Sequence, residues 1–216
     1  MIRTAPEGRW FIAGAWVVAL GLVVAAARTG APGWIVAAGL WSLLAVWVVA
    51  FFRDPERNWS RGDRLIVAPA DGKVVGVVEV DEPAFFQGRA QRVSIFMNVF
   101  DCHVNRYPAD GTVAYRHYNT GEFGHAGAEK SSLSNEQASV GLATARGKML
   151  IRQIAGLVAR RIVTDHEVGT VVHQGERLGM IRFGSRVDLF LPLGARVQAR
   201  VGDTTRVGVT VVAEWS

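Results

Sequence analysis

The chain has 216 residues, of which half are hydrophobic, and its formal net charge is +5. That length accommodates one domain of ordinary size together with an additional segment. The single cysteine, Cys102, excludes an internal disulfide and is typical of a reducing compartment. The histidines show no paired metal-ligand spacing, so we expect no metal ion. The sequence has no basic stripe interleaved with aromatic residues, which argues against nucleic acid as a partner.

Two uncharged apolar stretches predict a membrane hairpin within residues 1–52. They cover residues 10–27 and 33–52, and the RTGAP between them contains Gly and Pro. Each stretch is about long enough to cross the hydrocarbon layer as a helix. A signal peptide would be followed by a soluble chain rather than by a second apolar segment. A buried hairpin that is apolar on all sides would need a larger protein around it.

Basic residues flank this predicted hairpin. Arginines precede the first stretch and follow the second, at positions 3, 9, 53, 57, 61 and 64. Because basic flanks tend to stay inside, we expect both ends and the remaining chain on the cytoplasmic side of the cell membrane. Arg28, in the connecting turn, weakens this prediction slightly.

Residues 53–216 predict a mostly β domain, a compact barrel or sandwich. The tetrapeptide Pro-Ala-Asp-Gly occurs at 69–72 and again at 108–111, each time before a strand, which indicates two related turn-and-strand units. Short strands with Gly turns fill residues 169–216. Residues 119–148 are Gly- and Ser-rich and predict a long loop, whereas residues 149–163 fit either a strand or a helix.

A Gly184-Ser185 pair begins a segment whose apolar and polar residues alternate, as in a half-buried strand. The pair marks either a bulge or bend, or a peptide bond that another group must approach closely. Asp71 fits an Asx turn, and His103 fits a core or edge histidine. With Ser185 they also match an Asp/His/Ser set, in which a base activates the serine hydroxyl. The absence of a G-x-S-x-G turn argues against an α/β-hydrolase.

Motifs along nearly the whole chain resemble those of the phosphatidylserine decarboxylase family, in its short, membrane-attached prokaryotic form. They are PEGRWFI at 6–12, FFRDPER at 51–57, APADGKVV at 68–75, SIFMNVFDCHVNRYPADG at 94–111, SNEQ at 134–137, QIAGLVARRIV at 153–163 and GERLGMIRFGSRVDLFLP at 175–192. Each motif is weak alone, but the set in this order is specific.

The resemblance implies that the protein breaks its own Gly184–Ser185 bond. Ser185 would attack the Gly184 carbonyl, which would leave a large chain of residues 1–184 and a small chain of residues 185–216. The new N-terminus would become a covalent pyruvoyl cofactor, without a metal. This group would be the electron sink for decarboxylating phosphatidylserine to phosphatidylethanolamine and CO2. The hairpin would bring the site to a lipid that stays in the bilayer.

Roles for individual residues also follow from the resemblance. It assigns Asp71 to orienting or tuning a base in self-cleavage, and His103 to decarboxylation and protonation of the product. Longer family members have a second histidine where this chain has Arg106. The base for self-cleavage therefore stays open between His103 and another residue, with His125 as one candidate.

Substrate contacts are expected from polar residues within the predicted loop and from arginines outside it. Asn135 and Glu136 match a polar segment of the short form and are candidates for touching the substrate. Arg106, Arg182 or Arg186 would hold the phosphodiester.

Two other functions remain open. A membrane-held β module similar to lipoyl carriers or sugar-transport phosphocarrier domains shows comparable A-P-x-D-G-x-V turns. Lys73, Lys130 and Lys148 do not fit the hairpin-tip lysine that a lipoyl carrier needs. The other alternative is a relative with the decarboxylase fold that is inactive or acts on another serine-derived lipid. A carrier would stay one chain, whereas a decarboxylase of this family would become two. The sequence also leaves a homo-oligomer open.

Overall fold

The structure, a computed structural model, describes residues 3–121, 135–156, 161–182 and 184–216. His125 and Lys130, named above as candidates, lie outside these residues. The chain divides into two compact units, residues 1–56 and 57–216. Within the described residues the elements are η1 (Pro6–Gly8), α1 (Arg9–Thr29), α2 (Pro32–Phe51), β1 (Leu65–Val67), β2 (Gly72–Glu82), β3 (Gly88–Met97), β4 (Val104–Arg106), β5 (Gly111–Asn119), β6 (Gln137–Thr144), β7 (Gly147–Ala155), β8 (Ile162–Thr164), β9 (Val171–Val172), β10 (Arg177–Ile181), β11 (Ser185–Leu191), β12 (Arg196–Val197), β13 (Thr204–Thr205) and β14 (Val211–Glu214).

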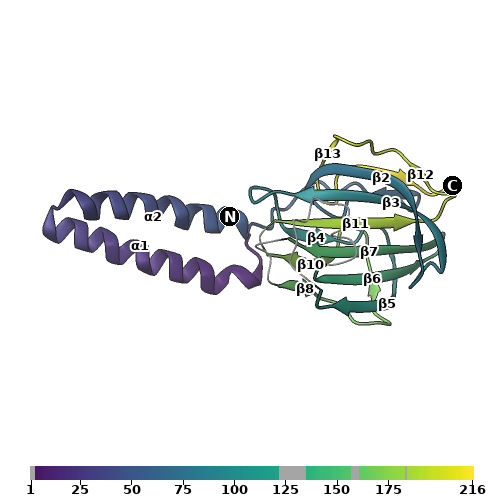
Figure 1. Ribbon diagram of the computed structural model, residues 1–216, viewed down its shortest axis with the longest axis horizontal. Coiled ribbons are helices and arrows are strands. Elements are labelled where there is room, and N and C mark those ends of the chain that lie inside the picture. The colour runs from purple at the N-terminus through teal and green to yellow at the C-terminus, as the bar shows by residue number, and fades with distance from the viewer. Residues whose placement is uncertain (1–2, 122–134, 157–160, 183) are drawn as a thin grey trace. The chain divides into compact units, whose positions relative to one another are not determined.

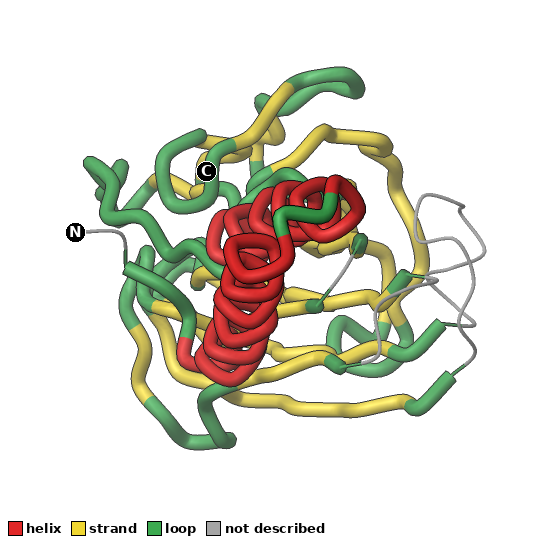
Figure 2. Tube along the Cα trace, turned by 90° about the vertical axis from the view of Figure 1, so that its left-hand side faces the viewer, coloured by secondary structure: helices red, strands yellow, loops and turns green. Residues whose placement is uncertain are grey.

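The N-terminal unit is a hairpin of two long apolar helices, which lie side by side in Figures 1 and 2. Small residues form their interface, because Ala15, Ala19, Ala38 and Ala45 are its buried positions. The indole N–H of Trp41 donates to the Ala15 carbonyl across this interface at 2.9 Å. Small residues and interhelical hydrogen bonds are typical of helix packing in lipid.

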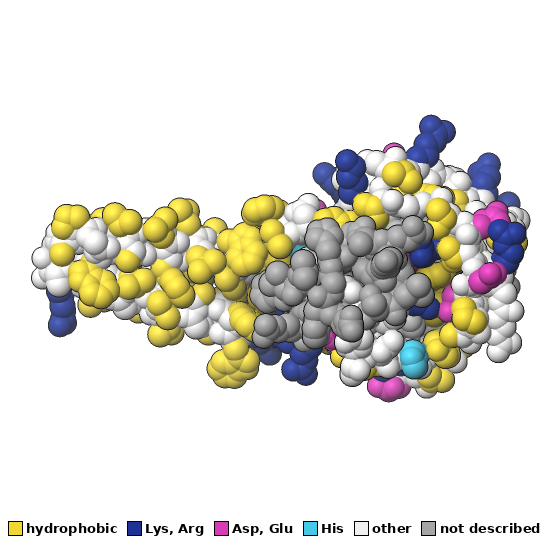
Figure 3. Space-filling view, in the orientation of Figure 1, with side chains coloured by type: hydrophobic (Ala, Val, Ile, Leu, Met, Phe, Trp, Pro, Cys, Tyr) yellow, Lys and Arg dark blue, Asp and Glu magenta, His cyan; other side chains and the backbone are white. Residues whose placement is uncertain are grey.

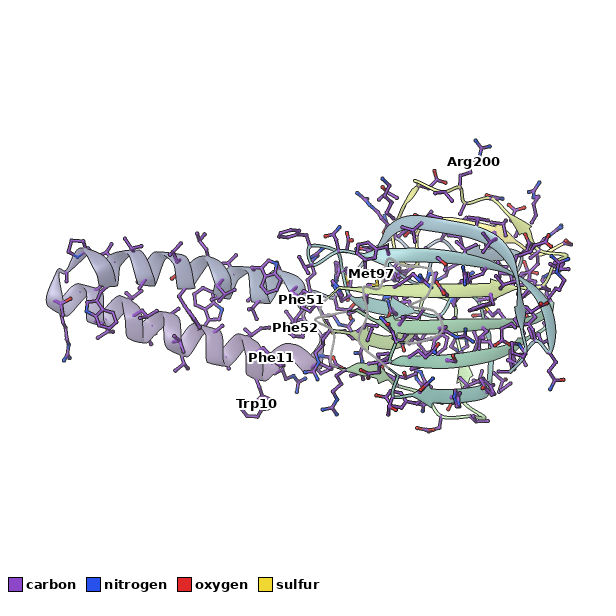
Figure 4. All side chains as sticks on the ribbon, viewed as in Figure 1. Trp10, Phe11, Phe51, Phe52, Met97 and Arg200 are labelled. Atoms are coloured by element: carbon purple, nitrogen blue, oxygen red, sulfur yellow. The ribbon has the colours of Figure 1, made fainter. Side chains whose placement is uncertain are left out.

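Both helices expose large hydrophobic side chains, such as Leu20 and Leu43, and the face of the hairpin seen in Figure 3 is largely apolar. Only 6% and 17% of the apolar windows of the two helices are buried. At one end of the hairpin, Phe11 stacks on Phe52, while Trp10 is 87% exposed (Figure 4). Both helices are long and apolar enough to cross a membrane, so the unit fits association with a membrane, as predicted.

The second unit is mostly β, as predicted, and its main element is a curled sheet that forms a half-barrel (Figure 1). The sheet has eight strands in the order β13-β2-β3-β11-β7-β6-β5-β9. Two three-stranded sheets, β1-β14-β12 and β4-β10-β8, accompany it. Apolar residues of all three sheets, such as Ile95, Val187, Ile181 and Val212, form one buried core.

The strand orders reveal an internal duplication, which confirms the two predicted turn-and-strand units. An outer repeat comprises β1–β3 and β11–β14, and an inserted repeat comprises β4–β10. Each repeat contributes four strands to the large sheet, β13-β2-β3-β11 and β9-β5-β6-β7, and one three-stranded sheet. The two Pro-Ala-Asp-Gly segments occupy matching places, directly before β2 and before β5. The repeats meet where β11 pairs with β7.

Two predictions about local structure were wrong. Residues 119–148 are not one loop, because β6 and the start of β7 lie within them. Small residues in β6 serve close packing, since a Cβ on Gly141 would lie 2.8 Å from the Phe85 ring. The strand after Gly184 is buried on both faces rather than on one. Its polar residues Arg186 and Asp188 form a buried ion pair at 2.9 Å.

Candidate active site

The Gly184-Ser185 pair lies at the entrance to β11, in the middle of the large sheet. Ser185 is the first residue of β11 and pairs with Met97 of β3 and Ala155 of β7. Both pairings run on without a register shift, so the pair is not a β-bulge. Gly184 has a φ of +58°, and a Cβ added there would meet no atom within 4 Å from any residue beyond its two chain neighbours. Glycine is therefore favoured by the left-handed backbone rather than by crowding.

The carbonyl group of Gly184 accepts a hydrogen bond from the backbone N–H of Gly156 at 3.1 Å. This bond continues the pairing of β7 with β11 by one step. A donor on this oxygen polarises the carbonyl and would stabilise negative charge that develops on it during attack. Gly156 was not a candidate from the sequence, because only the pairing of two distant strands brings its N–H to this carbonyl.

The hydroxyl group of Ser185 is fully buried and donates to the Met97 sulfur at 3.4 Å. A thioether is a weak acceptor, so Met97, labelled in Figure 4, restrains the hydroxyl without removing its proton. The Asn105 amide donates to the same sulfur at 3.7 Å. Gln153 donates to Asn105 at 2.9 Å, and Thr164 donates to Gln153 at 3.0 Å. A chain of polar groups thus leads from Ser185 to β8.

His103 is completely buried beside the strand that leads to Ser185. Its carbonyl accepts a hydrogen bond from Ile181 N–H, at the end of β10. Its Nδ1 lies 3.1 Å from the carbonyl oxygen of Asp101. Because a carbonyl only accepts, this contact places a proton on Nδ1 and leaves Nε2 as the basic nitrogen of the neutral ring.

Asp71 precedes β2 at the same end of the sheet at which β11 begins, with β3 between the two strands. Two strand spacings, about 10 Å, separate these backbones. The Asp71 carboxylate accepts two hydrogen bonds from the Arg57 guanidinium, at 2.6 and 2.7 Å, and one from Val207 N–H at 2.7 Å. Asp71 therefore caps a distant turn rather than a local Asx turn.

The inserted repeat contains a counterpart of this capping contact. Asp110, in the second Pro-Ala-Asp-Gly segment, accepts a hydrogen bond from Gln174 N–H at 2.6 Å. Gln174 follows β9 as Val207 follows β13. An aspartate thus caps the equivalent turn in both repeats. Asp71 in addition forms a bidentate ion pair with Arg57.

Asn135 and Glu136 lie beside the strand that pairs with Ser185. The Asn135 amide donates to the Ala155 carbonyl at 2.7 Å, and Ala155 N–H donates to the Glu136 carbonyl at 2.9 Å. The Glu136 carboxylate accepts a hydrogen bond from the Tyr118 hydroxyl at 2.5 Å. This bond, with partial burial, raises the pKa of Tyr118 to about 12.

The three arginines predicted to hold a phosphodiester lie in different surroundings. Arg106 donates to the Gly175 carbonyl at 3.0 Å, and its guanidinium lies over the Trp59 ring. Arg186 follows Ser185 in β11 and projects to the other face of the sheet, where it pairs with Asp188. Arg182 is partly exposed, three residues before Ser185.

The structure therefore brings Asn135 and Glu136 to β7, which flanks Ser185, and His103 to the end of β10, the strand that leads to Ser185. The sequence reasoning assigned no role to Met97, Asn105, Gln153 and Gly156. The first three look like ordinary strand residues, and only the register of β3, β4 and β7 places their polar groups in contact. Within the described residues, no group of three or more His, Cys, Asp or Glu side chains is placed to hold a metal ion.

Comparison with known proteins identifies the family. The sequence profile described as phosphatidylserine decarboxylase matches residues 44–213. A phosphatidylserine decarboxylase proenzyme from Magnetococcus marinus is 46% identical over 188 residues, which is 86% of each chain. One from Symbiobacterium thermophilum is 49% identical over 78% of this chain and 79% of its own. One from Nitrosomonas europaea is 43% identical over 98% of this chain and 94% of its own. The chain belongs to the phosphatidylserine decarboxylase family.

Proposed function

We propose that this chain is a proenzyme that cleaves itself between Gly184 and Ser185 and then decarboxylates phosphatidylserine to phosphatidylethanolamine and CO2. The observation that carries the proposal is the junction itself, in a chain of this family. There a buried serine hydroxyl follows a left-handed glycine whose carbonyl already accepts a hydrogen bond from Gly156. The relatives' names, which call them proenzymes, support a processed chain.

The proposed cleavage balances as an internal acyl transfer followed by elimination. The Ser185 oxygen attacks the Gly184 carbonyl carbon, and its proton passes to the Ser185 nitrogen as the amide bond becomes an ester. Loss of the Ser185 α-proton then breaks the bond between Cβ and oxygen, which releases residues 1–184 with a carboxylate. The enamine left on residue 185 isomerises to an imine, and one water molecule converts it to a ketone with loss of ammonia.

The surroundings of residue 185 fit a pyruvoyl group, since the group is built from that residue's own atoms and needs no additional volume. When formed, it supplies an electron sink for the carbanion produced by loss of CO2. Its neighbours Met97 and Ala155 are buried. We assign His103 to protonation of the product carbanion, because the Asp101 carbonyl holds the Nδ1 proton and Nε2 can then take up a proton from solvent and deliver it to the carbanion.

The small chain would stay in place after cleavage. Its first strand, β11, lies between β3 and β7 of the large chain in the sheet. Its strands β13 and β14 pair with β2 and β1. Separation would require these backbone hydrogen bonds to break and buried residues such as Val187 and Leu189 to become exposed. We therefore infer a two-chain enzyme that separates only on denaturation.

The hairpin fits this function because the substrate is a two-chain lipid that stays in the bilayer. We propose that both helices cross the membrane and that the β domain lies on the cytoplasmic side. The basic residues on both flanks of the hairpin support this orientation.

An intact mass spectrum of the purified protein beside the Ser185→Ala variant tests the proposal. We expect two chains from the wild type, with a pyruvoyl mass on residues 185–216, and one uncut chain from the variant. The processed wild type should release CO2 from phosphatidylserine. A wild type that stays one chain in fresh and aged samples would support the carrier or the inactive relative instead.

A further inference from the structure

A pocket of about 370 Å³ lies between the edge of the large sheet and β8. Its described lining consists of Arg116, His117 and Tyr118 of β5, Ala138 and Ser139 of β6, and Arg161, Ile162, Val163 and Thr164 in and before β8. None of these nine residues is an acid, whereas two are arginines. The pocket is large enough for a small polar ligand, and its charge favours an anion.

The two arginines are available to an anion in different ways. Arg161 is exposed at the mouth of the pocket. Arg116 contacts Glu167 at 2.5 Å, but the Glu167 side chain is 84% exposed. An ion pair with such an exposed partner contributes little, because water screens it. A desolvated phosphodiester would compete for the Arg116 guanidinium through two parallel hydrogen bonds.

Backbone and side-chain contacts connect this pocket to the cleavage junction. The Arg161 carbonyl accepts a hydrogen bond from Arg182 N–H, three residues before Ser185. Thr164, in the pocket wall, begins the hydrogen-bonded chain through Gln153 and Asn105 that ends at Met97 and Ser185. Tyr118 in the opposite wall donates to Glu136, whose carbonyl binds Ala155, the partner of Ser185.

We propose that this pocket binds the phosphodiester of the glycerophosphoserine headgroup, with Arg161 and Arg116 as its ligands. The inference rests on the proposed function, because it places the headgroup beside residue 185. The hydroxyl protons of Tyr118 and Thr164 are already donated to Glu136 and Gln153. Of the other side chains in the lining, the two arginines carry the positive charge and the paired N–H donors that suit the anion. The phosphodiester site is thus formed by the inserted repeat, while Ser185 belongs to the outer repeat.

The test uses full-length Arg161→Gln and Arg116→Gln in detergent, with Arg200→Gln as the control. Arg200 is an exposed arginine between β12 and β13, outside the pocket (Figure 4). Intact mass first establishes that each protein is cut into two chains. Turnover is then measured in mixed micelles of phosphatidylserine and dodecyl maltoside. Loss of one charge-assisted contact should raise KM about tenfold or more while kcat changes less than about twofold. Arg161→Lys should restore part of the affinity, and Arg200→Gln should match the wild type.

Soluble ligands distinguish the lipid headgroup from free phosphate. Glycerophosphoserine should compete with phosphatidylserine in the wild type, and its inhibition constant should rise in Arg161→Gln. If inorganic phosphate alone competes, the pocket is a phosphate site and the headgroup assignment is wrong. If Arg161→Gln and Arg116→Gln are both cut into two chains and both keep the KM of the wild type, the headgroup assignment is also wrong. A wild type that is uncut or does not decarboxylate would instead refute the proposed function. If Arg161→Gln is not cut, Arg116→Gln and the inhibition of the wild type decide the question.

Discussion

Replacement of Gly184 by alanine tests whether backbone conformation, rather than space, suits this position to the proposed self-cleavage. The φ of +58° lies in the left-handed region, and no residue beyond the two chain neighbours lies within 4 Å of an added Cβ. Alanine therefore costs roughly 1–2 kcal/mol through its backbone alone. If the attack needs the left-handed conformation, each 1.4 kcal/mol that alanine adds to the cost of that conformation lowers its population about tenfold. We expect self-cleavage of Gly184→Ala to slow about tenfold or somewhat more, without being abolished.

Asparagine makes the test specific, because it tolerates the left-handed region better than alanine although it is larger. Cleavage rates, followed by intact mass after synthesis, should rank glycine first, asparagine second and alanine last. Gly194→Ala is the matched control, because Gly194 also has open space but no positive φ. If asparagine and alanine both stop cleavage as completely as Ser185→Ala, a side chain as such blocks the attack. If the Gly184→Ala variant cleaves itself as fast as the wild type, the left-handed conformation of residue 184 has no role in cleavage.

Three further outcomes are expected. His103→Ala, once cut, should lose decarboxylation by about 100-fold or more, measured as CO2 release, and normal turnover would remove His103 from the mechanism. Asp71→Ala should slow cleavage, whereas Asp110→Ala, which removes the equivalent capping carboxylate, should lower thermal stability alone; equal slowing in both would make Asp71 structural. Glu136→Gln should lower the pKa of Tyr118 from about 12 toward its ordinary 10, seen in a spectrophotometric tyrosine titration. Because folding raises the pKa of Tyr118, the protonated phenol stabilises the folded protein. This contribution is fully present below pH 10 and is lost as the pH rises through about 12.

The sequence predicted the helical hairpin and the two related β units, because each has a strong local signal. Uncharged stretches predicted the two helices, and the repeated Pro-Ala-Asp-Gly predicted two related units. The prediction was wrong where burial came from tertiary structure. Alternation in β11 indicated one solvated face, but Arg186 and Asp188 neutralise each other on a buried face. In β6, the lack of large side chains indicated a loop, although Gly141 is small because Phe85 packs against it.

The site could be predicted only in part, for a related reason. Ser185, His103 and Asp71 lie in recognisable motifs, and each could be named from the sequence. The residues that surround Ser185 come from β3, β4 and β7, and their contacts depend on strand register, which the sequence does not show. Glycine at 184 was expected to let the Ser185 hydroxyl approach the carbonyl, and the structure adds a second reason for glycine, a left-handed backbone that the sequence does not show.

The duplication explains why a cut at this junction is compatible with a stable fold. In the inserted repeat, the last residue of β6, Thr144, pairs with the first residue of β7, Gly147, across a tight turn. In the outer repeat, the last residue of β3, Met97, pairs in the same way with the first residue of β11, Ser185. There the whole inserted repeat replaces the turn. The Gly184–Ser185 bond is therefore not part of a hairpin turn. It connects the end of the inserted repeat to the next strand of the outer repeat. The proposed cleavage would leave the outer repeat assembled from both chains, so a new chain end could form at a buried position while the strands around it stay paired.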